Sequence, residues 1–309
     1  SLLVRMHADG SCDREVIGSV AGCLKADWQD EDWQTLCRMF CDPSLQMVSF
    51  TITEKGYALR DMDGTLLPVV AQDLAAGPFR PRHTLSIAVA LLYQRFLAGG
   101  SPIAVVSMDN CAQNGKKLRD SCLTLAEDWQ EGGFVPEDFL RWLSCEESVS
   151  FPWSMIDKIT PHPSQKVADQ LTALGVAGMA ITKSATGTVS APLRQCRGDG
   201  VSGVGGSFPQ RSASAGAGGC LLHDRATVEK SEKMKVGTCL NPLHTALAVF
   251  GCLLDYQTIS AEMQDTDLVT LVERIAGESL PVVEDPGILR PTEFIHQVLH
   301  ERFPNPAIP

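Results

Sequence analysis

The strongest constraint on the fold is the alternation of strand-like and helix-like segments over the first 165 residues. Apolar, β-branched runs at 47–53 and 103–108 indicate strands, and apolar residues at helical spacing favour a helix over 30–40. A nearly continuous apolar run favours a buried helix over 83–97. Strands that are apolar throughout and alternate with helices are typical of a parallel, doubly wound sheet. We therefore expect an α/β fold in which ligands bind beyond the carboxyl ends of the strands.

Two other segments extend this expectation. An apolar run over 16–24 predicts a further strand. From about residue 226 onward the pattern is helical, and the run from Leu243 to Tyr256 is apolar nearly all round, so it should form a central, buried helix. The candidate N-caps of the later helices are Asp265 or Thr266, and Thr292.

Composition restricts the partners of the chain. It has 26 basic and 37 acidic residues, a formal net charge of −11, which argues against nucleic acid or an anionic membrane as a partner. No stretch approaches about 18 uninterrupted apolar residues, and no basic-then-apolar signal peptide opens the sequence. The 11 cysteines form no C-x-x-C pair, which indicates reduced thiols, a cytoplasmic protein and no zinc site.

One polar segment carries groups suited to the oxidation of an alcohol. It reads Glu232-Lys-Met-Lys-Val-Gly-Thr-Cys-Leu-Asn-Pro-Leu-His244 and precedes an apolar run. An amine can take the hydroxyl proton as a general base, while an amide and an imidazole hold the oxygen and its developing charge. Asn241 and His244 are three residues apart, so they share a face of a helix. Two interpretations remain open, a metal-free catalytic site and a solvated helix end.

Three more segments run from apolar strands into polar residues. They are Met47-Val-Ser-Phe-Thr-Ile-Thr-Glu-Lys-Gly-Tyr57, Ile103-Ala-Val-Val-Ser-Met-Asp-Asn-Cys-Ala-Gln-Asn-Gly115 and Ser150-Phe-Pro-Trp-Ser-Met-Ile-Asp-Lys-Ile-Thr-Pro161. Together with the Lys/Asn/His segment, and in the same order and rough spacing, they resemble the mannitol dehydrogenase family of polyol and sugar-acid dehydrogenases. The resemblance covers most of residues 1–192 and 222–309, and the form of 53–57 is most similar to the fructuronate reductase branch.

This resemblance implies an NAD-dependent oxidoreductase, with NADP as the second choice of cofactor. The implied substrate is a ketose-derived sugar acid, with fructuronate reduced to mannonate. The alternative is mannitol 2-dehydrogenase or a related polyol dehydrogenase acting at the same carbon. A small sugar acid or polyol is thus the expected partner, and the sequence does not define an oligomeric state.

The resemblance also implies a role for each motif residue. Lys235 would be the general acid–base residue, with an amine whose pKa is lowered by burial. Asn110 and Asn241 would bind the reacting oxygen, His244 would position a hydroxyl, and Glu232 would relay protons to solvent. The residues implied near the cofactor are Thr53, Glu54, Ser107 and Asp157. Position alone also predicts three of these as site residues, namely Thr53, Glu54 and Ser107, because they lie at the carboxyl ends of predicted strands.

The spacing of the catalytic segment departs from the family in one respect. Five residues separate Lys235 from Asn241, where the family has four. On a regular α-helix the extra residue would turn the lysine by about 100°. A π-bulge could absorb it, and Pro242 could relax the spacing by starting a new helical turn. Lys233 departs further from the family spacing.

The resemblance predicts three parts along the chain. Residues 1–190 would form a Rossmann-like dinucleotide-binding domain, and 226–309 a helical substrate and catalytic domain. Neither the family's glycine-rich first turn nor its last helical stretch is found in the sequence, so we expect an internal fragment with an incomplete sheet. A hypothesis of another class follows, namely an inactive fragment that does not bind cofactor.

The segment between these parts, 191–225, is expected to be irregular. Eight of residues 194–219 are glycine. Its Gly198-Asp-Gly-Val-Ser-Gly203 matches G-x-G-x-x-G but lacks a preceding strand and a following helix, so we reject it as a dinucleotide site and expect a surface loop. Two explanations for the composition stay open, a flexible glycine-serine loop and a segment translated out of frame up to about His223.

Overall fold

The computed structural model describes residues 2–6, 11–52, 54–109, 111–156, 163–183, 189–191, 193–197, 202–209 and 220–306. Contacts divide the chain into two compact units. The sheet unit comprises residues 23–156 and 202–229, and the helical unit comprises 1–22, 157–201 and 230–309. These units cut across the boundaries expected at 190 and 225, because the start and the middle of the chain group with the C-terminal helices.

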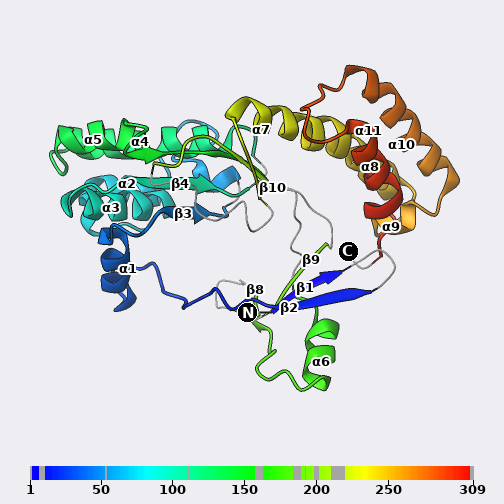
Figure 1. The fold of residues 1–309 in the computed structure, drawn as a ribbon, viewed down its shortest axis with the longest axis horizontal. Helices are drawn as coiled ribbons and strands as arrows, with labels where there is room; N and C mark the ends of the chain where they lie inside the picture. The colour runs from blue at the N-terminus through cyan, green and yellow to red at the C-terminus, as the bar shows by residue number, and fades with distance from the viewer. Residues whose placement is uncertain are drawn as a thin grey trace. The chain divides into compact units, whose positions relative to one another are not determined.

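The sheet unit is built on the predicted parallel sheet. Its strands are β3 (Met47–Phe50), β4 (Ile103–Ser107) and β5 (Val149–Ser150), in the order β3-β4-β5. The helices around it are α1 (Asp32–Cys41), α2 (Pro68–Ala76), α3 (Thr84–Leu97), α4 (Asn114–Glu131) and α5 (Glu137–Ser144) (Figure 1). The strands expected at 47–53 and 103–108 and the helices expected over 30–40 and 83–97 are therefore confirmed.

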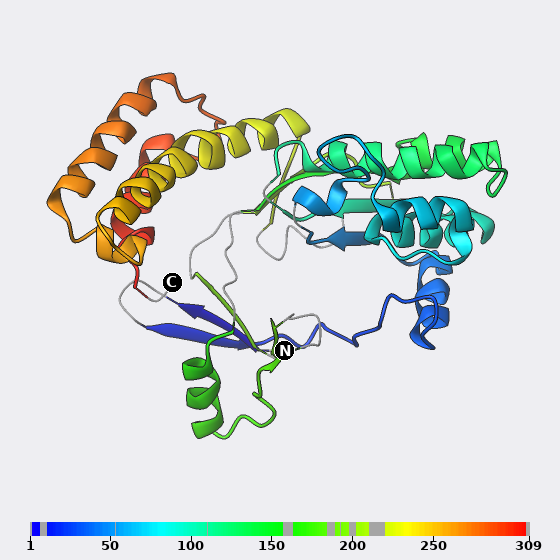
Figure 2. The same ribbon diagram turned by 180° about the vertical axis from the view of Figure 1, so that it is seen from behind.

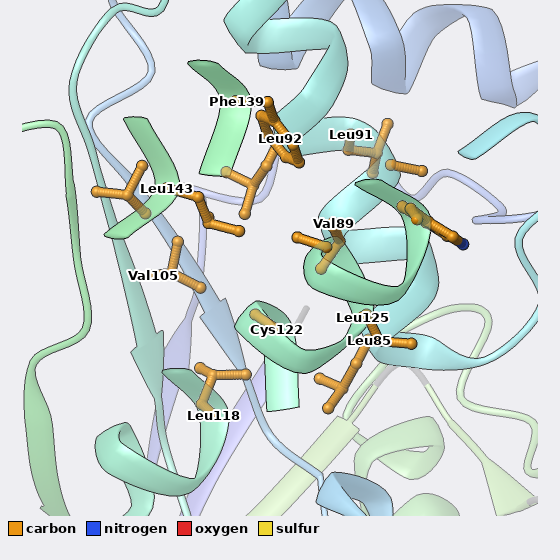
Figure 3. Close-up of a cluster of buried hydrophobic side chains, with 14 of the residues drawn as sticks. Leu85, Val89, Leu91, Leu92, Val105, Leu118, Cys122, Leu125, Phe139 and Leu143 are labelled. Carbon is orange, nitrogen blue, oxygen red and sulfur yellow. The ribbon is translucent and has the colours of Figure 1, made fainter. Parts of the chain in front are cut away.

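Strand β4 is buried along its whole length, which explains its unbroken apolar sequence. Ile103 and Val105 belong to the main hydrophobic cluster, in which α3, α4 and α5 supply most of the side chains (Figure 3). Ala104 and Val106, on the opposite face, pack with Val204. Two apolar layers thus hold β4 in the centre of the sheet unit and fix its carboxyl end.

A second sheet lies in the same unit. Its strands are β6 (Trp153–Ile156), β10 (Ser202–Gly205) and β11 (Cys220–His223), in the order β11-β10-β6. The expectation of an irregular segment and a surface loop was therefore wrong at Ser202 and Gly203, which begin a paired strand. Backbone pairing overrides the low strand propensity of glycine here, since β10 pairs on both sides. Gly198 to Val201 lie outside the described residues.

The helical unit contains a small sheet of its own. Strand β1 (Leu2–Met6) pairs antiparallel with β2 (Cys12–Val16) and parallel with β9 (Leu193–Arg197). Val4 of β1 packs with Leu171 of α6 (Gln165–Ala173). The strand expected over 16–24 was wrong, because β2 ends at Val16 and most of 17–24 is exposed. Without a pairing partner, an apolar run cannot satisfy its backbone groups as a strand.

Helices form the rest of the helical unit, and the first of them begins at Arg225, in the sheet unit. One helix runs from Arg225 to Leu253 and comprises α7 (Arg225–Glu232), the π-helix η3 (Lys233–Leu240) and α8 (Asn241–Leu253). The others are α9 (Ile259–Glu262), α10 (Thr266–Ser279), the 3-10 helix η4 (Leu280–Val282), α11 (Pro291–Gln297) and the π-helix η5 (Val298–Arg302) (Figure 2). Leu243 and Leu247 of α8 share one core with Leu268 and Val272 of α10.

Two helix predictions need correction. Helix α8 is not buried all round, because Leu243, Leu247 and Gly251 face the core while the other side remains exposed, with Leu253 75% exposed. An apolar sequence buries only the face on which other helices pack. Thr292 is not an N-cap, since Pro291 already begins α11 and its fixed φ suits a first helical position. Asp265 does cap α10, accepting from the backbone of Asp267 at 2.8 Å.

The buried carboxyl of Glu262 gives a stability prediction. It is 3% exposed, its side chain lies so close to Gly251 that a Cβ there would overlap it, and burial raises the pKa of Glu262. A carboxyl whose pKa is raised on folding stabilises the protein at low pH, and this contribution is lost as pH rises through the folded-state pKa. We expect Glu262→Gln to be more stable than the native protein near neutral pH, with the difference shrinking in acid.

Urea unfolding at several pH values measures this difference. Glu273→Gln is the control, because Glu273 lies on α10 and is exposed. A Glu262→Gln variant that gains no stability over the native protein between acid and neutral pH would contradict the prediction.

Candidate functional site

The predicted catalytic lysine lies in a π-helix. Helix η3 covers Lys233–Leu240, so the extra residue between Lys235 and Asn241 is accommodated by π-helical winding, the first of the two possibilities raised by the spacing. Lys235 is 1% exposed, with its amine 4.7 Å from the ring centre of Phe294 in α11. Lys233, two residues earlier, is exposed. The structure thus distinguishes the two lysines, and Lys235 is not on the open surface.

The neighbouring motif residues follow on the same helix. Glu232 is half-buried and lies immediately before η3, three residues ahead of Lys235. Asn241 begins α8, where Pro242 occupies the first turn, and Asn241 and His244 are both exposed. The His244 ring lies 6.2 Å from the ring of Phe303. A buried amine is therefore followed by an amide and an imidazole that are open to a ligand.

The carboxyl end of β4 carries a second cluster of polar groups. The Tyr57 hydroxyl lies 2.5 Å from the Ser107 hydroxyl and also donates to the Asp109 carboxylate. Ser107 donates to the same carboxylate at 3.0 Å, and the backbone N–H of Cys111 donates to its other oxygen at 2.9 Å. Burial, and then the bond to Asp109, raises the pKa of the Tyr57 hydroxyl far above its ordinary value. Tyr57 thus remains a proton donor that holds Asp109.

Asn114, at the start of α4, also makes hydrogen bonds to the region around Asp109. It is fully buried at the start of α4, and its amide donates to the backbone oxygens of Asp109 and Ser154, each at 3.0 Å. Its side-chain oxygen accepts from the backbone of Gly115 and Ser154. The residues on both sides of position 110 are therefore tied to β6 and to α4 by hydrogen bonds.

The predicted cofactor residues have different outcomes. Ser107 is buried and bonded to Tyr57 and Asp109, so its side chain supports the end of β4 from within. Glu54 begins the 3-10 helix η1 (Glu54–Tyr57), is exposed, and pairs with Lys117 at 2.5 Å, which lowers the pKa of Glu54. Thr53, Asn110 and Asp157 lie outside the described residues. The expected convergence of Lys235 with Asn110, and the place of Asp157 beside them, stay predictions.

Removing the Tyr57 hydroxyl should have a measurable effect. Tyr57→Phe takes one donor from the buried side of Asp109, and a hydrogen bond to a charged group contributes about 1.5–3 kcal/mol. We expect the free energy of unfolding to fall by about 2 kcal/mol, as measured in urea. Tyr93→Phe is the matched control, because the Tyr93 ring packs on Phe139 and its hydroxyl makes no hydrogen bond to a described residue. Equal stability of the two variants would contradict the assigned role.

Other features of the described residues do not add to this site. A cavity of about 250 Å³ in the sheet unit is lined by Lys116, Arg119, Arg225 and Glu146, among others, and by none of the predicted site residues. Arg225 pairs with Glu146 at 2.5 Å, and Lys116 pairs with Asp120 at 2.6 Å, so most of this charge is already neutralised. Within the described ranges no group of three or more His, Cys, Asp or Glu residues could hold a metal ion.

The parallel sheet and the polar groups at its edge place the chain among Rossmann-type proteins. Residues 4–174 match the family model of the mannitol dehydrogenase Rossmann domain. Over its whole length the chain is 45% identical to D-mannonate oxidoreductase of Thermotoga maritima, of which it covers 57%. The chain belongs to the mannitol dehydrogenase family.

Solved structures agree with this assignment. The fold is similar to D-sorbitol dehydrogenase in substrate-free form, with a TM-score of 0.82, 24% identity, and coverage of 99% of this chain and 59% of that one. It is also similar to Pseudomonas fluorescens mannitol 2-dehydrogenase in a ternary complex with NAD and D-mannitol, with a TM-score of 0.78, 26% identity, and coverage of 98% and 57%. The chain thus spans somewhat more than half the length of these proteins.

Membership of the family also bears on the long helix. By length and composition, Arg225–Leu253 is the one helix among the described residues that could cross a membrane, although core helices pass the same test. This helix carries the segment that resembles the family's catalytic motif, and Lys235 is buried against Phe294 of α11. We therefore interpret it as a helix of the folded protein.

The sequence did not point to three polar residues, two near the carboxyl end of β4 and one in η5. Tyr57 and Asn114 lie inside segments that carried the resemblance, yet nothing in their spacing indicated a buried network. The adjacent Asn114-Gly115 pair was the available signal, because a buried helix start needs acceptors and donors for its free backbone groups. Arg302 is buried, and its guanidinium lies 4.7 Å from the centre of the Phe294 ring, a contact that no motif predicted.

Proposed function

We propose that this chain carries the Rossmann-type and catalytic parts of an oxidoreductase that interconverts fructuronate and mannonate with NAD(H). The observation that carries the proposal is the buried Lys235 in a π-helix that leads directly to Asn241 and His244. The 45% identity with a D-mannonate oxidoreductase supports this choice of substrate. A cytoplasmic location is part of the same proposal.

The residues at the carboxyl end of β4 fit a dinucleotide. Cofactors bind beyond the carboxyl ends of parallel strands, and Ser107, Asp109 and Asn114 hold that end rigidly. Thr53, Glu54 and Asp157, together with the loop after Ser107, are the groups we propose to hold the cofactor. When bound, NAD(H) supplies or accepts the hydride.

The chain's own residues handle the proton and the oxygen. In reduction, the ammonium group of Lys235 gives a proton to the carbonyl oxygen and becomes a neutral amine, while the carbonyl carbon receives hydride, and the product is a secondary alcohol. Asn241 and Asn110 hold that oxygen as negative charge develops on it, and His244 orients a neighbouring hydroxyl. Glu232, half-buried one turn before Lys235, returns a proton from solvent. The scheme uses no metal, because the lysine and the amides stabilise the reacting oxygen as zinc does in other alcohol dehydrogenases.

Steady-state reduction of fructuronate and of fructose, with NADH and with NADPH, tests the proposal. We expect fructuronate to be turned over faster, NADH to be preferred, and the rate to be unchanged by a chelator. Faster turnover of fructose would instead favour mannitol 2-dehydrogenase or a related polyol dehydrogenase, and inhibition reversed by zinc would contradict the metal-free scheme.

Calorimetry with NADH tests the alternative from another class, a folded polypeptide that does not bind cofactor. Micromolar binding by the 309-residue chain would refute that alternative. Absence of both binding and turnover in the folded chain would support it.

A further inference from the structure

Two arginines that have no charged partner line a second cavity in the sheet unit. This cavity has a volume of about 310 Å³ and is formed by the segment before α1, by α2 and by the turn that leads into α3. Arg80 and Arg82 lie in that turn and are exposed. Neither side chain makes a hydrogen bond or an ion pair with any residue that the structure describes. Their positive charge is therefore available to a ligand.

Trp28 holds one of the two guanidinium groups in place. It is half-buried on the wall of the cavity, and the Arg80 guanidinium lies 5.5 Å from the centre of its ring. A guanidinium that stacks on an aromatic ring is held by its face, so the N–H groups at its edge can still donate. Planar forks of this kind bind carboxylate and phosphate oxygens through paired hydrogen bonds. Arg80 is thus positioned to bind an oxyanion.

Asp73 also lines the cavity, but its carboxylate is bonded to the backbone of the turn. It is 1% exposed and accepts from the backbone N–H groups of Arg82 and His83, at 3.0 and 2.8 Å. Asp73 therefore fixes the turn that carries the two arginines. Its single negative charge lowers the affinity for an anion but does not cancel two guanidinium groups.

Two further acidic residues, in the segment before α1, are paired with a lysine. Asp27 and Asp30 lie 3.4 and 3.2 Å from the amine of Lys25. Beside them, the side-chain amides of Gln29 and Gln72 line the cavity and make no hydrogen bond to a described residue. Two cations and two amides thus surround one cavity, whose volume is in the range of small-molecule sites.

We propose that this cavity is a binding site for a small organic anion, whose phosphate or carboxylate group is held by Arg80 and Arg82. The amides of Gln29 and Gln72 are placed to bind its remaining oxygen atoms, since an amide can both donate and accept. The site goes beyond the proposed function and does not depend on it, because no residue of the proposed catalytic scheme lines the cavity.

Isothermal titration calorimetry of the 309-residue chain, at constant ionic strength, tests the site. The probes are inorganic phosphate, glucose 6-phosphate and gluconate. We expect at least one of them to bind with a Kd below about 1 mM. Comparison of glucose 6-phosphate with gluconate distinguishes the two kinds of oxyanion, and inorganic phosphate measures binding of the phosphate group alone.

Substitutions of the two arginines show whether the anion binds in this cavity. Arg80→Gln and Arg82→Gln should each weaken binding by at least about tenfold, because each removes charge-assisted hydrogen bonds. Both variants should fold, since both side chains are exposed. Arg38→Gln is the matched control, because it removes the same charge from an exposed arginine of α1 that does not line the cavity. It should change the Kd less than about twofold.

Three results would overturn the proposal. The first is that none of the three probes binds with a Kd below about 1 mM. The second is binding that neither Arg80→Gln nor Arg82→Gln weakens, because the anion then lies elsewhere. The third is an equal loss in Arg38→Gln, because net charge alone then attracts the anion. If one arginine variant does not fold, the other decides. Failure of the proposed substrate would appear only in the turnover assays.

Discussion

Replacing Lys235 with methionine should lower kcat for the proposed reduction of fructuronate by about 10³-fold, within the range that a positioned general acid contributes. Methionine keeps most of the length of the side chain and removes the only atom that the mechanism needs. The fold should survive, because an apolar side chain in a buried position avoids the cost of burying a charged or polar group. Stopped-flow or steady-state rates at saturating substrate and cofactor measure the loss.

The matched control for this variant lies two residues away. Lys233 is on the same π-helix but is exposed, so Lys233→Met should change kcat less than about twofold and stability by less than about 0.5 kcal/mol. A Lys235→Met enzyme that keeps more than a tenth of the native kcat would remove Lys235 from the acid–base role. Equal losses in both variants would point to disruption of the helix instead.

Local sequence patterns predicted the sheet unit well. Strands β3 and β4 and helices α1 and α3 were all predictable. Strand β4 is buried along its whole length and is therefore uniformly apolar, helix α1 repeats its apolar residues every three to four positions, and α3 is apolar nearly throughout because most of it is buried. The same rule failed at α8, where an equally apolar helix exposes one side. An apolar sequence shows which side chains of a helix could be buried, but the elements that pack against the helix determine which of them are buried.

The candidate site was predictable only in part. The resemblance pointed to Lys235, and the extra residue before Asn241 led to the correct suggestion of π-helical winding. The contacts of Tyr57 and Asn114 could not be predicted, because each joins residues that lie far apart in the chain. Tyr57 reaches Asp109 across 52 positions, and Asn114 reaches Ser154 across 40. Short-range periodicity carries no information on such pairs.

A buried arginine holds the amino ends of the parallel strands, opposite the polar groups at the carboxyl end of β4. Arg95 of α3 is 1% exposed and donates to five backbone oxygens over 2.6–3.0 Å, so all five of its N–H groups are used. The acceptors belong to the end of α1 and to the loops that enter β3 and β4. They are Phe40, Asp42, Leu45, Ser101 and Pro102.

Arg95→Met should therefore lower the free energy of unfolding by about 5 kcal/mol, since it leaves several buried carbonyl groups without donors. Arg95→Lys should recover part of this loss, because an ammonium has three donors and lacks the planar fork. Urea unfolding measures both, with Arg38→Met as the control, because Arg38 is exposed and bonds only Thr35 among the described residues. The surviving folded Arg95→Met enzyme should keep its kcat, in contrast to Lys235→Met. A loss below about 1 kcal/mol would mean that water replaces the guanidinium at these carbonyls.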